Sequence, residues 1–302
     1  MITKPMLAVD MDESKLIFPY IAQPKIDGVR AIHLYGKPTI SGRSLKLFAN
    51  KSIPLLFPHL EGVDGELTYG SITAPDLCRT TTSVVNTIND DRYSSLVWNV
   101  FDYITPETEH LGYLQRYELL KQLITDSPNH NVHIVPYQVV NSLEELTAYE
   151  QKCLISGYEG VILRSPTALP KNGRTTVREN SYLRIKRFVQ EDAIVLSITE
   201  AMENTNEAVT NALGNTERST HQSNLLPKGM LGSLICQDIK TGATITVGPG
   251  ELTHEQRTYY WSNQSELVGK TISYKFFPKG VKDKPRFASY VTIRDSSDLV
   301  DE

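Results

Sequence analysis

The 302-residue sequence has only three cysteines, Cys78, Cys153 and Cys236, and none of them belongs to a Cys-x-x-Cys pair. It therefore suits neither a disulfide framework nor a structural zinc site. No stretch approaches the roughly 20 uninterrupted apolar residues of a membrane span, and the N-terminus lacks the apolar block of a secretory signal. We expect a protein of a reducing compartment, the cytoplasm, without a membrane partner.

A large charge of one sign is also missing, because 31 basic and 35 acidic side chains give a formal net charge of -4. With 40% apolar and 22% charged residues, the composition excludes collagen-like, low-complexity and wholly disordered chains. The charge is nevertheless uneven, since residues 151–190 carry eight basic and two acidic side chains. A second basic cluster lies near the C-terminus. Both clusters can follow a phosphate backbone, although a solvated surface gives the same pattern.

The chain is long enough for two domains, and its pattern changes near residue 190. Before that point, β-prone runs at 96–104 and 160–164 alternate with helical periodicity, which predicts an α+β domain. One predicted helix begins at Ser142, where the serine and Glu145 can satisfy each other's backbone amides, and Gly157 is placed to end it.

After residue 190 the sequence predicts five strands and one helix, the inventory of an all-β OB-fold. The helix is expected to begin at a reciprocal cap between Thr253 and Gln256. The expected strands are Ala193–Ile198, Ser233–Ile239, Ala243–Val247, Thr271–Phe277 and Ser289–Arg294. Residues 202–231 are polar and contain too few large apolar groups to bury themselves. We expect a loop or an exposed hairpin there that orders when something binds it.

The strongest chemical signal is the run Lys25-Ile-Asp27-Gly28-Val-Arg30. It places an amine beside a glycine turn, flanked by a carboxylate and a guanidinium. Neighbouring positive charge and a bound metal can hold such an amine unprotonated, and an unprotonated amine is a nucleophile. An Asp-Gly turn with solvated charges gives the same pattern, so the interpretation depends on the rest of the chain.

Further motifs follow in order along the sequence. Arg43, in Ser-Gly-Arg-Ser, lies in a turn that suits a bidentate grip on phosphate. Glu66 and Glu159 each stand at the mouth of an expected strand, where two carboxylates can hold a sugar hydroxyl or a magnesium ion. Arg184 and Lys186 alternate with apolar residues, so they project from one face of a strand as a phosphate clamp. Turns, a helix cap or a solvated edge explain each of these motifs taken singly.

Together and in this order, the motifs resemble those of the covalent nucleotidyltransferases, the superfamily of ATP-dependent DNA ligases, RNA ligases and mRNA capping enzymes. The resemblance covers essentially the whole chain and narrows to minimal viral ATP-dependent DNA ligases of the chlorella virus type. Residues 217–223, 229–234 and 284–294 are similar to the second domain of such ligases. The resemblance implies a nucleotidyltransferase (adenylation) domain at 1–189 and an OB-fold domain at 190–302. The segment 202–231 would be a latch-like insert that closes around duplex DNA.

The resemblance also implies roles for individual residues. Lys25 would be the adenylylated nucleophile, supported by Asp27. The nucleotide would be bound by Gln23, Arg30, Glu66, Phe101, Arg184, Lys186, Arg286 and Arg294, with Phe101 stacked on adenine and Arg30 and Glu66 at the sugar. Arg184 and Lys186 would hold the α-phosphate, Arg286 and Arg294 the pyrophosphate, and Glu159 and Glu66 the metal. The DNA would be contacted by Arg43, Arg174, Arg218 and Lys282, with Arg43 at the 5′-phosphate of the nick.

Two departures from the family pattern stand out. Arg184 replaces a more common lysine, and Ser296 follows Asp295, so an Arg-x-Asp-Lys ending is absent.

The function implied by the resemblance is an ATP-dependent DNA ligase that seals nicks between a 3′-hydroxyl and a 5′-phosphate. Lysyl-AMP and DNA-adenylate would be its intermediates. It would use ATP and Mg²⁺, with Mn²⁺ as a substitute, and act as a monomer on nicked duplex DNA. The alternatives are an RNA ligase or an mRNA capping guanylyltransferase, which share the lysine motif, and a non-catalytic DNA-binding module. The module would retain DNA without ever carrying covalent AMP.

Overall fold

The structure, a computed structural model, describes residues 2–186, 188–277 and 285–294. The chain forms two compact units, residues 1–186 and 187–302, which are described separately. All three cysteines are free thiols, which agrees with the prediction that they form no disulfide framework. Within the described ranges no helix has the length and apolarity needed to cross a bilayer.

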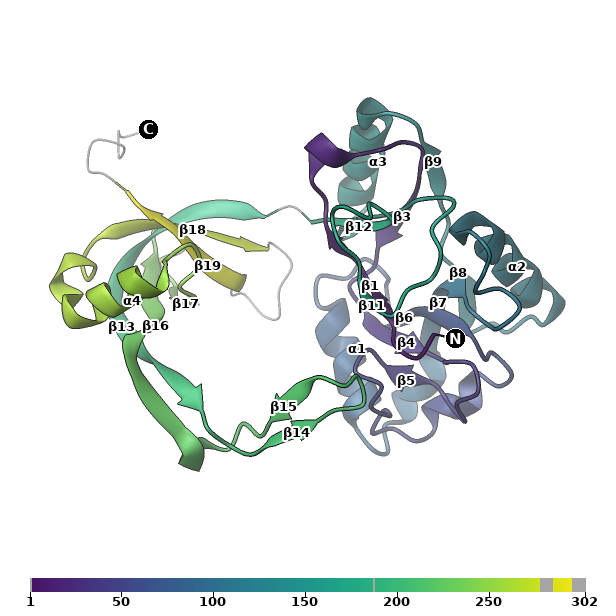
Figure 1. Ribbon diagram of the computed structural model, residues 1–302, viewed down its shortest axis with the longest axis horizontal. Helices are drawn as coiled ribbons and strands as arrows, with labels where there is room; N and C mark the ends of the chain where they lie inside the picture. The colour runs from purple at the N-terminus through teal and green to yellow at the C-terminus, as the bar shows by residue number, and fades with distance from the viewer. Residues whose placement is uncertain (1, 187, 278–284, 295–302) are drawn as a thin grey trace. The chain divides into compact units, whose positions relative to one another are not determined.

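The first unit is an α+β domain, as the sequence predicts (Figure 1). Its strands are β1 (Met6–Leu7), β2 (Val9–Asp10), β3 (Tyr20–Lys25), β4 (Val29–Ile32), β5 (Ser41–Gly42), β6 (Val63–Tyr69), β7 (Leu96–Tyr103), β8 (Val132–Ile134), β9 (Gln138–Val140), β10 (Gly160–Arg164), β11 (Gly173–Arg174) and β12 (Tyr182–Ile185). Its α-helices are α1 (Leu77–Asn86), α2 (Tyr113–Asp126) and α3 (Leu143–Ile155). Short 3₁₀ turns are η1 (Glu13–Lys15), η2 (Ile53–Leu56) and η3 (Asp91–Ser95).

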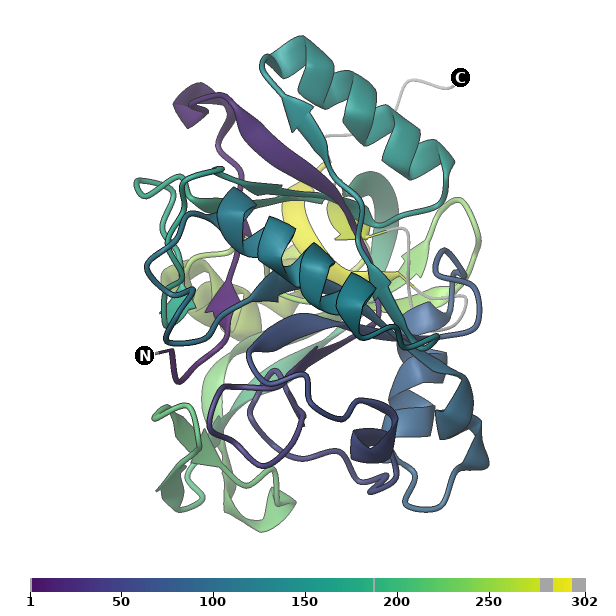
Figure 2. The same cartoon turned by 90° about the vertical axis from the view of Figure 1, so that its right-hand side faces the viewer.

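Two five-stranded sheets organise this unit, in the orders β2-β12-β10-β3-β9 and β5-β4-β6-β7-β8, and β1 pairs with β11. Helix α3 packs on the first sheet through Leu146, Tyr149 and Cys153. Helices α1 and α2 contribute side chains to the core of the second sheet. Figure 2 shows α3 on the outside of the first sheet. Helix α3 thus covers the outer face of the first sheet, whereas α2 packs against side chains of both sheets, including Ile21 of β3.

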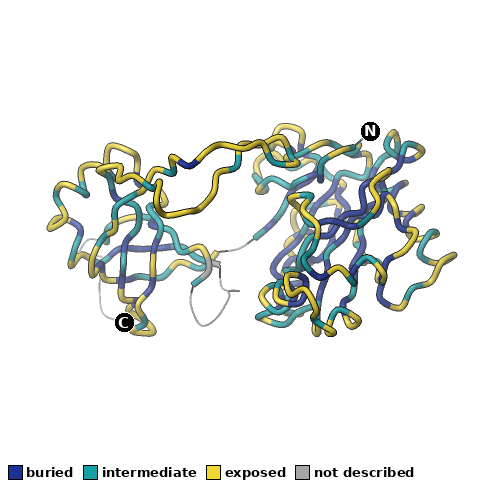
Figure 3. Tube along the Cα trace, turned by 90° about the horizontal axis from the view of Figure 1, so that it is seen from below, coloured by how far each residue is buried: buried dark blue, intermediate teal, exposed yellow. Residues whose placement is uncertain are grey.

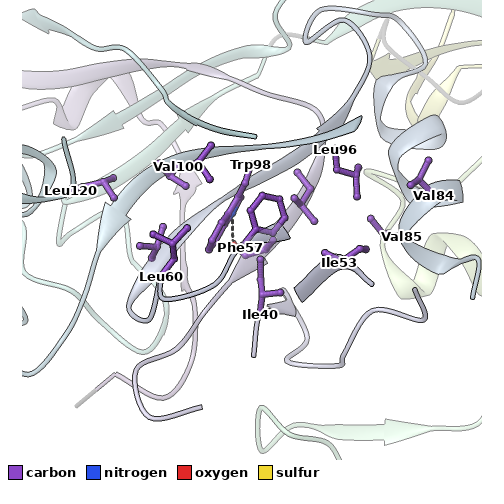
Figure 4. Close-up of a cluster of buried hydrophobic side chains, with 14 residues drawn as sticks. Ile40, Ile53, Phe57, Leu60, Val84, Val85, Leu96, Trp98, Val100 and Leu120 are labelled. Atoms are coloured by element: carbon purple, nitrogen blue, oxygen red, sulfur yellow. Dashed lines mark hydrogen bonds between the residues drawn. The ribbon is translucent and has the colours of Figure 1, made fainter. Parts of the chain in front are cut away.

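The core of the second sheet is built around Trp98, which is fully buried (Figure 4). Its ring centroid lies 5.2 Å from that of Phe57, and its Nε1 donates a hydrogen bond to the Ala31 carbonyl over 3.2 Å. A buried indole with its N–H satisfied stabilises a core strongly, because a large apolar area leaves water and no donor is left unpaired. Strands β4, β6 and β7 are thereby held rigidly behind the site.

The local signals at α3 are partly confirmed. Ser142 caps the helix, accepting a hydrogen bond from the Glu145 amide, and Gly157 follows the helix with a φ of 88°. The reciprocal bond is not made, however, because the Glu145 carboxylate accepts from the Asn141 amide, one residue further out, at 2.8 Å. The helix begins where the sequence predicts, but its cap reaches one residue beyond the predicted box.

In the described part of the second unit, five strands form one sheet beside the helix α4 (His254–Ser262), as the OB-fold prediction requires, and two further strands pair as a separate hairpin. Its sheet has the order β17-β16-β13-β18-β19. The elements are β13 (Val189–Asn204), β14 (Ala208–Thr210), β15 (Thr216–Arg218), η4 (Gln222–Asn224), β16 (Leu225–Asp238), β17 (Thr244–Val247), α4 (His254–Ser262), η5 (Gln264–Glu266), β18 (Thr271–Phe277) and β19 (Arg286–Ile293). The reciprocal cap between Thr253 and Gln256 is present at α4.

Strands β13 and β16 are longer than predicted and pair as far as Asn204 and Leu225. Beyond that pair lies the hairpin β14–β15, whose residues are mostly exposed (Figure 3). Asn206, only 5% exposed, stabilises the start of this hairpin by donating hydrogen bonds to the carbonyls of Ser219 and His221, both at 2.9 Å. Polar contacts thus replace the missing apolar core, and the segment forms the exposed hairpin that its composition predicts.

Candidate active site

A cavity of about 320 Å³ opens on the inner faces of the two sheets of the first unit. The strand register explains which residues reach it. Opposite residues in antiparallel strands share a face, so Gln23 and Arg184 lie on the same face as their partner Ile162. The alternate residues, such as Val161 and Leu183, are buried on the other face in the core beneath α3. The predicted residues that line the cavity are Gln23, Lys25, Arg30, Arg43, Glu66, Phe101, Arg174 and Arg184.

Lys25 lies at the end of β3, and its Nζ donates to Oε2 of Glu159. The other oxygen of Glu159 pairs with Nζ of Lys186. The Glu159 side chain is only 3% exposed. Burial favours its neutral form, but the two ammonium groups outweigh burial and hold its pKa below the usual range. One buried carboxylate therefore contacts both the predicted nucleophile, Lys25, and the predicted phosphate ligand, Lys186.

Gly28 is required by sterics rather than by flexibility. A Cβ at this position would lie 2.2 Å from the Leu67 carbonyl oxygen and 2.9 Å from Cγ of Glu66. The turn after Lys25 thus lies directly against β6. Burial raises the pKa of Glu66, and the charge of Asp27 in this turn adds to the rise.

Arg30 is held by Asp64, a residue that the sequence did not single out for the site. Nε and Nη2 of Arg30 lie 2.6 Å from the two carboxylate oxygens of Asp64, which is 2% exposed. The guanidinium carbon lies 4.9 Å from the centre of the Phe101 ring. A bidentate pair of this kind fixes the plane of the guanidinium. Glu66 pairs with Arg30 across the β4–β6 ladder, and burial raises the pKa of Glu66 to about 7.

Four more arginines line the cavity, namely Arg43, Arg164, Arg174 and Arg184. Arg184 donates two hydrogen bonds to the Asp10 carboxylate, from Nε to Oδ1 at 2.6 Å and from Nη2 to Oδ2 at 3.1 Å. Arg174 donates to the Ala8 carbonyl at 2.6 Å. Burial lowers the pKa of Arg43, and repulsion from Arg174 lowers it further. Such a concentration of guanidinium groups attracts phosphate.

Phe101 occupies a β-bulge. Asp64 pairs with Asp102 and Gly65 pairs with Val100, so β7 has one extra residue at this point. Bulges re-aim side chains and are common beside active sites. Phe101 lines the cavity here, as expected for a residue that stacks on a base.

Behind Phe101 lies a buried cluster that sequence reasoning missed. The Asp102 carboxylate accepts hydrogen bonds from Arg116 at 2.8 and 3.1 Å and from Arg164 at 2.7 Å. The Arg164 guanidinium carbon also lies 5.3 Å from the Phe101 ring and 3.9 Å from that of Tyr182. The Asp102 position beside Phe101 was the one available signal, but the two arginines are 14 and 62 residues away along the chain.

The remaining predicted residues belong to the second unit. Nε of Arg294 contacts Oδ1 of Asp192 at 3.0 Å, and Arg218 donates to the Asn206 carbonyl within the hairpin. Lys282 and the side chain of Arg286 lie outside the described residues. Among the residues that the structure describes, no group of three or more His, Cys, Asp and Glu side chains is arranged to hold a metal ion.

Comparison with protein families gives two matches. Residues 5–186 match the ATP dependent DNA ligase domain, and residues 227–294 match the DNA ligase OB-like domain. No curated protein matches the chain.

Solved structures give similar matches. The chlorella virus DNA ligase-adenylate is 29% identical, with a TM-score of 0.54, and 98% of this chain and 99% of that one are covered. A Lig E DNA ligase, described as binding DNA with a minimal scaffold, shares the fold at a TM-score of 0.73 and 21% identity. That alignment covers 97% of this chain and 100% of the other.

Both matched families are those of DNA ligases, which decides against the RNA ligase, capping enzyme and non-catalytic alternatives. The first match alone spans more than half of the chain, over the unit that holds Lys25 and the cavity. The chain therefore belongs to the ATP-dependent DNA ligases, and its function is to seal nicks in DNA using ATP.

Proposed function

We propose that sealing proceeds through an intermediate in which AMP is bonded to Nζ of Lys25. The protein would be a minimal ligase of the chlorella virus type and would act as a monomer on nicked duplex DNA. The observation that carries this proposal is the position of Lys25 in the wall of a cavity lined by arginines. The chlorella virus protein, 29% identical over nearly its whole length, was solved as a ligase-adenylate, which supports the same intermediate here.

Three displacements at phosphorus make up the reaction. Nζ of Lys25, without its proton, attacks the α-phosphorus of ATP; an N–P bond forms and the P–O bond to pyrophosphate breaks. The 5′-phosphate of the nick then attacks the same phosphorus and frees the lysine. Finally the 3′-hydroxyl attacks the 5′-phosphorus, loses its proton and releases AMP. Such steps need alignment and positive charge more than acid–base groups.

Glu159 and Lys186 prepare the first displacement. Before ATP binds, Glu159 holds both ammonium groups, and each lysine has a partner. An α-phosphate entering beside them would take Lys186 as its counter-charge, together with Arg184. Lys25 would then need to lose its proton before attacking, and Glu159, whose pKa is held low by the two ammonium groups, would position the lysine rather than act as its base.

The contacts to the nucleoside come from both sheets. Phe101 would stack on adenine, and Gln23, which is 3% exposed, would meet the edge of the base. Arg30, fixed by Asp64, and Glu66 would hold the sugar hydroxyls, with Asp27 supporting this part of the site. Arg43 would hold the 5′-phosphate of the nick.

The carboxylates fit Mg²⁺, and Mn²⁺ as a substitute. Magnesium in nucleotide sites usually takes one or two protein carboxylates together with phosphate oxygens, so a cluster of three ligands is not required. Glu159 would hold the ion, with Glu66 as the second carboxylate. When bound, the ion neutralises charge on the phosphate oxygens.

DNA contacts would come from Arg174 in the first unit and from the hairpin segment 202–231, with Arg218, in the second. Arg286 and Arg294 would contact pyrophosphate, and Lys282 would contact DNA. The segment carries few charges, and its threonines and some of its asparagines are exposed and can hydrogen-bond to phosphate and sugar. We expect sequence-independent binding that weakens steeply with salt.

The test of the lysine assignment is mass spectrometry of the purified protein after incubation with ATP and Mg²⁺. Adenylate should appear on Lys25, and Lys25→Arg, which keeps the charge, should abolish both the adduct and nick sealing. Lys15→Arg, at an exposed surface lysine, is the matched control. A folded wild type with no adduct, or an adduct on another lysine, would contradict the proposal.

The test of the latch replaces residues 205–224 with a short Gly-Ser linker, because the β13–β16 ladder ends at Asn204 and Leu225. Adenylylation of Lys25 should be retained, and affinity for a nicked duplex and sealing should be lost. Unchanged affinity for the nick would refute the latch.

A further inference from the structure

One hydroxyl links the two sheets behind the cavity. Tyr113, the first residue of α2, is fully buried and is not part of the cavity wall. Its hydroxyl lies 2.7 Å from Oε1 of Gln23 on β3 and 2.8 Å from the carbonyl oxygen of Phe101 on β7. A tyrosine O–H has a single proton, which these two acceptors share. The hydroxyl therefore fixes both groups relative to each other.

Phe101 benefits from this contact because it sits at the bulge in β7. The extra residue of a bulge is left out of the regular ladder, so its backbone is less constrained than that of its neighbours. The hydrogen bond from Tyr113 to the Phe101 carbonyl adds a constraint from outside the sheet. The orientation of the ring in the cavity therefore depends partly on α2.

Gln23 benefits in a different way. Its Nε2 donates to the Val135 carbonyl at 3.0 Å, and its Oε1 accepts from Tyr113. With the oxygen and the nitrogen each committed to a different partner, the amide cannot exchange its two ends without losing both bonds. Tyr117 donates to the same Val135 carbonyl at 2.8 Å and holds that acceptor in place. Gln23 thus presents one fixed polar pattern to the cavity.

A fixed amide discriminates between purines, whereas a rotating one does not. Adenine and guanine exchange donors and acceptors on the edge that carries the 6-substituent. A glutamine that can flip satisfies either base, and a glutamine held in one orientation leaves a polar group unpaired against the wrong one.

We propose that Tyr113 is a positioning residue for nucleobase recognition, which acts through Gln23 and Phe101 and contributes to the choice of ATP over GTP. This inference deepens the proposed function and rests on its assignment of Gln23 and Phe101 to the base.

The test is Tyr113→Phe in the full chain, which removes the hydroxyl and keeps the ring. We expect KM for ATP in lysyl-AMP formation to rise about 2- to 10-fold, the range for the loss of one hydrogen bond. The preference for ATP over GTP should fall by a similar factor. At saturating ATP the rate of lysyl-AMP formation should change less than KM does, because Tyr113 does not touch the reacting atoms. Tyr20→Phe is the matched control, because Tyr20 is equally buried and bonds to the Ile17 amide away from the cavity.

A second variant separates positioning from general destabilisation. If Tyr113 acts through Gln23, its replacement should no longer change the ATP-to-GTP preference when Gln23 is already methionine. An unchanged preference in Tyr113→Phe, or an equal loss in Tyr20→Phe, would overturn the inference. An unchanged ATP-to-GTP preference in Gln23→Met alone would also overturn the inference. This measurement does not depend on whether the tyrosine variant folds. Absence of lysyl-AMP in the wild type would instead contradict the proposed function.

Discussion

Replacing Asp102 by asparagine should destabilise the first unit more than any surface change. Asp102 is 1% exposed and lies between the guanidinium groups of Arg116 and Arg164, which are 0% and 2% exposed. Removing one partner of a buried ion pair typically costs about 3–5 kcal/mol, because the remaining charge stays buried without compensation. Asparagine retains one carbonyl oxygen as an acceptor, so we expect a loss of about 3 kcal/mol.

This loss of stability can be measured as a drop in melting temperature. For a unit of 186 residues, a change of 1 kcal/mol moves the midpoint by about 2–4 °C, so the expected drop is about 6–12 °C. The assay is thermal unfolding of the full chain followed by circular dichroism. Asp76→Asn is the control, because it breaks the Asp76–Arg79 pair, whose side chains are about half exposed. That change should cost about 1 kcal/mol or less.

The pH dependence gives a second readout. Burial alone would raise the pKa of Asp102, but Arg116 and Arg164 outweigh it and hold the pKa below its usual value of 3.8. Because the folded pKa lies below the unfolded one, the stabilisation is present above pH 3.8 and is lost as the pH falls through the folded pKa. The gap between wild type and Asp102→Asn should narrow in acid. Melting temperatures within 2 °C of each other at pH 7, or a gap that widens in acid, would refute the reasoning.

Three further predictions test the site. Gly28→Ala should abolish adenylylation and lower the melting temperature, because the new Cβ would lie 2.2 Å from a carbonyl oxygen of β6. Normal activity in this variant would show that the turn can move. Asp10→Asn and Arg184→Lys should each slow lysyl-AMP formation, and the double variant should be no slower than the worse single one, because both remove one two-point contact. Additive losses in single-turnover assays would contradict this coupling. Burial raises the pKa of Glu66 to about 7, so its contribution to stability is present below pH 4.5 and is lost as the pH rises through 7. The melting temperature of Glu66→Gln should therefore rise relative to that of the wild type between pH 5 and 8. A difference in melting temperature that stays constant over this range would rule out this titration.

Local patterns predicted much of the architecture. The alternation around Arg184 placed it on one face of β12, since side-chain direction in a strand follows from the backbone alone. The caps at Ser142 and Thr253 marked the starts of α3 and α4, because a cap is made within four residues. The five strands of the main sheet in the second unit were predicted, but β13 and β16 extend further than their apolar runs. Their outer pairs are backbone hydrogen bonds, which leave no apolar signature in the sequence.

The sequence by itself determined which chemical groups this ligase has and in what order, because motif residues such as Lys25, Glu159 and Arg184 are recognisable from type and spacing. Only the tertiary structure decided which groups act on one another. Lys25 meets Glu159 across 134 residues, Arg184 meets Asp10 across 174, and Tyr113 meets Gln23 across 90. No local propensity encodes such pairs, because they arise when sheet register and helix packing bring distant positions onto one face. The charges that Asp10 and Asp64 supply to the site could therefore be assigned only after the strands were paired.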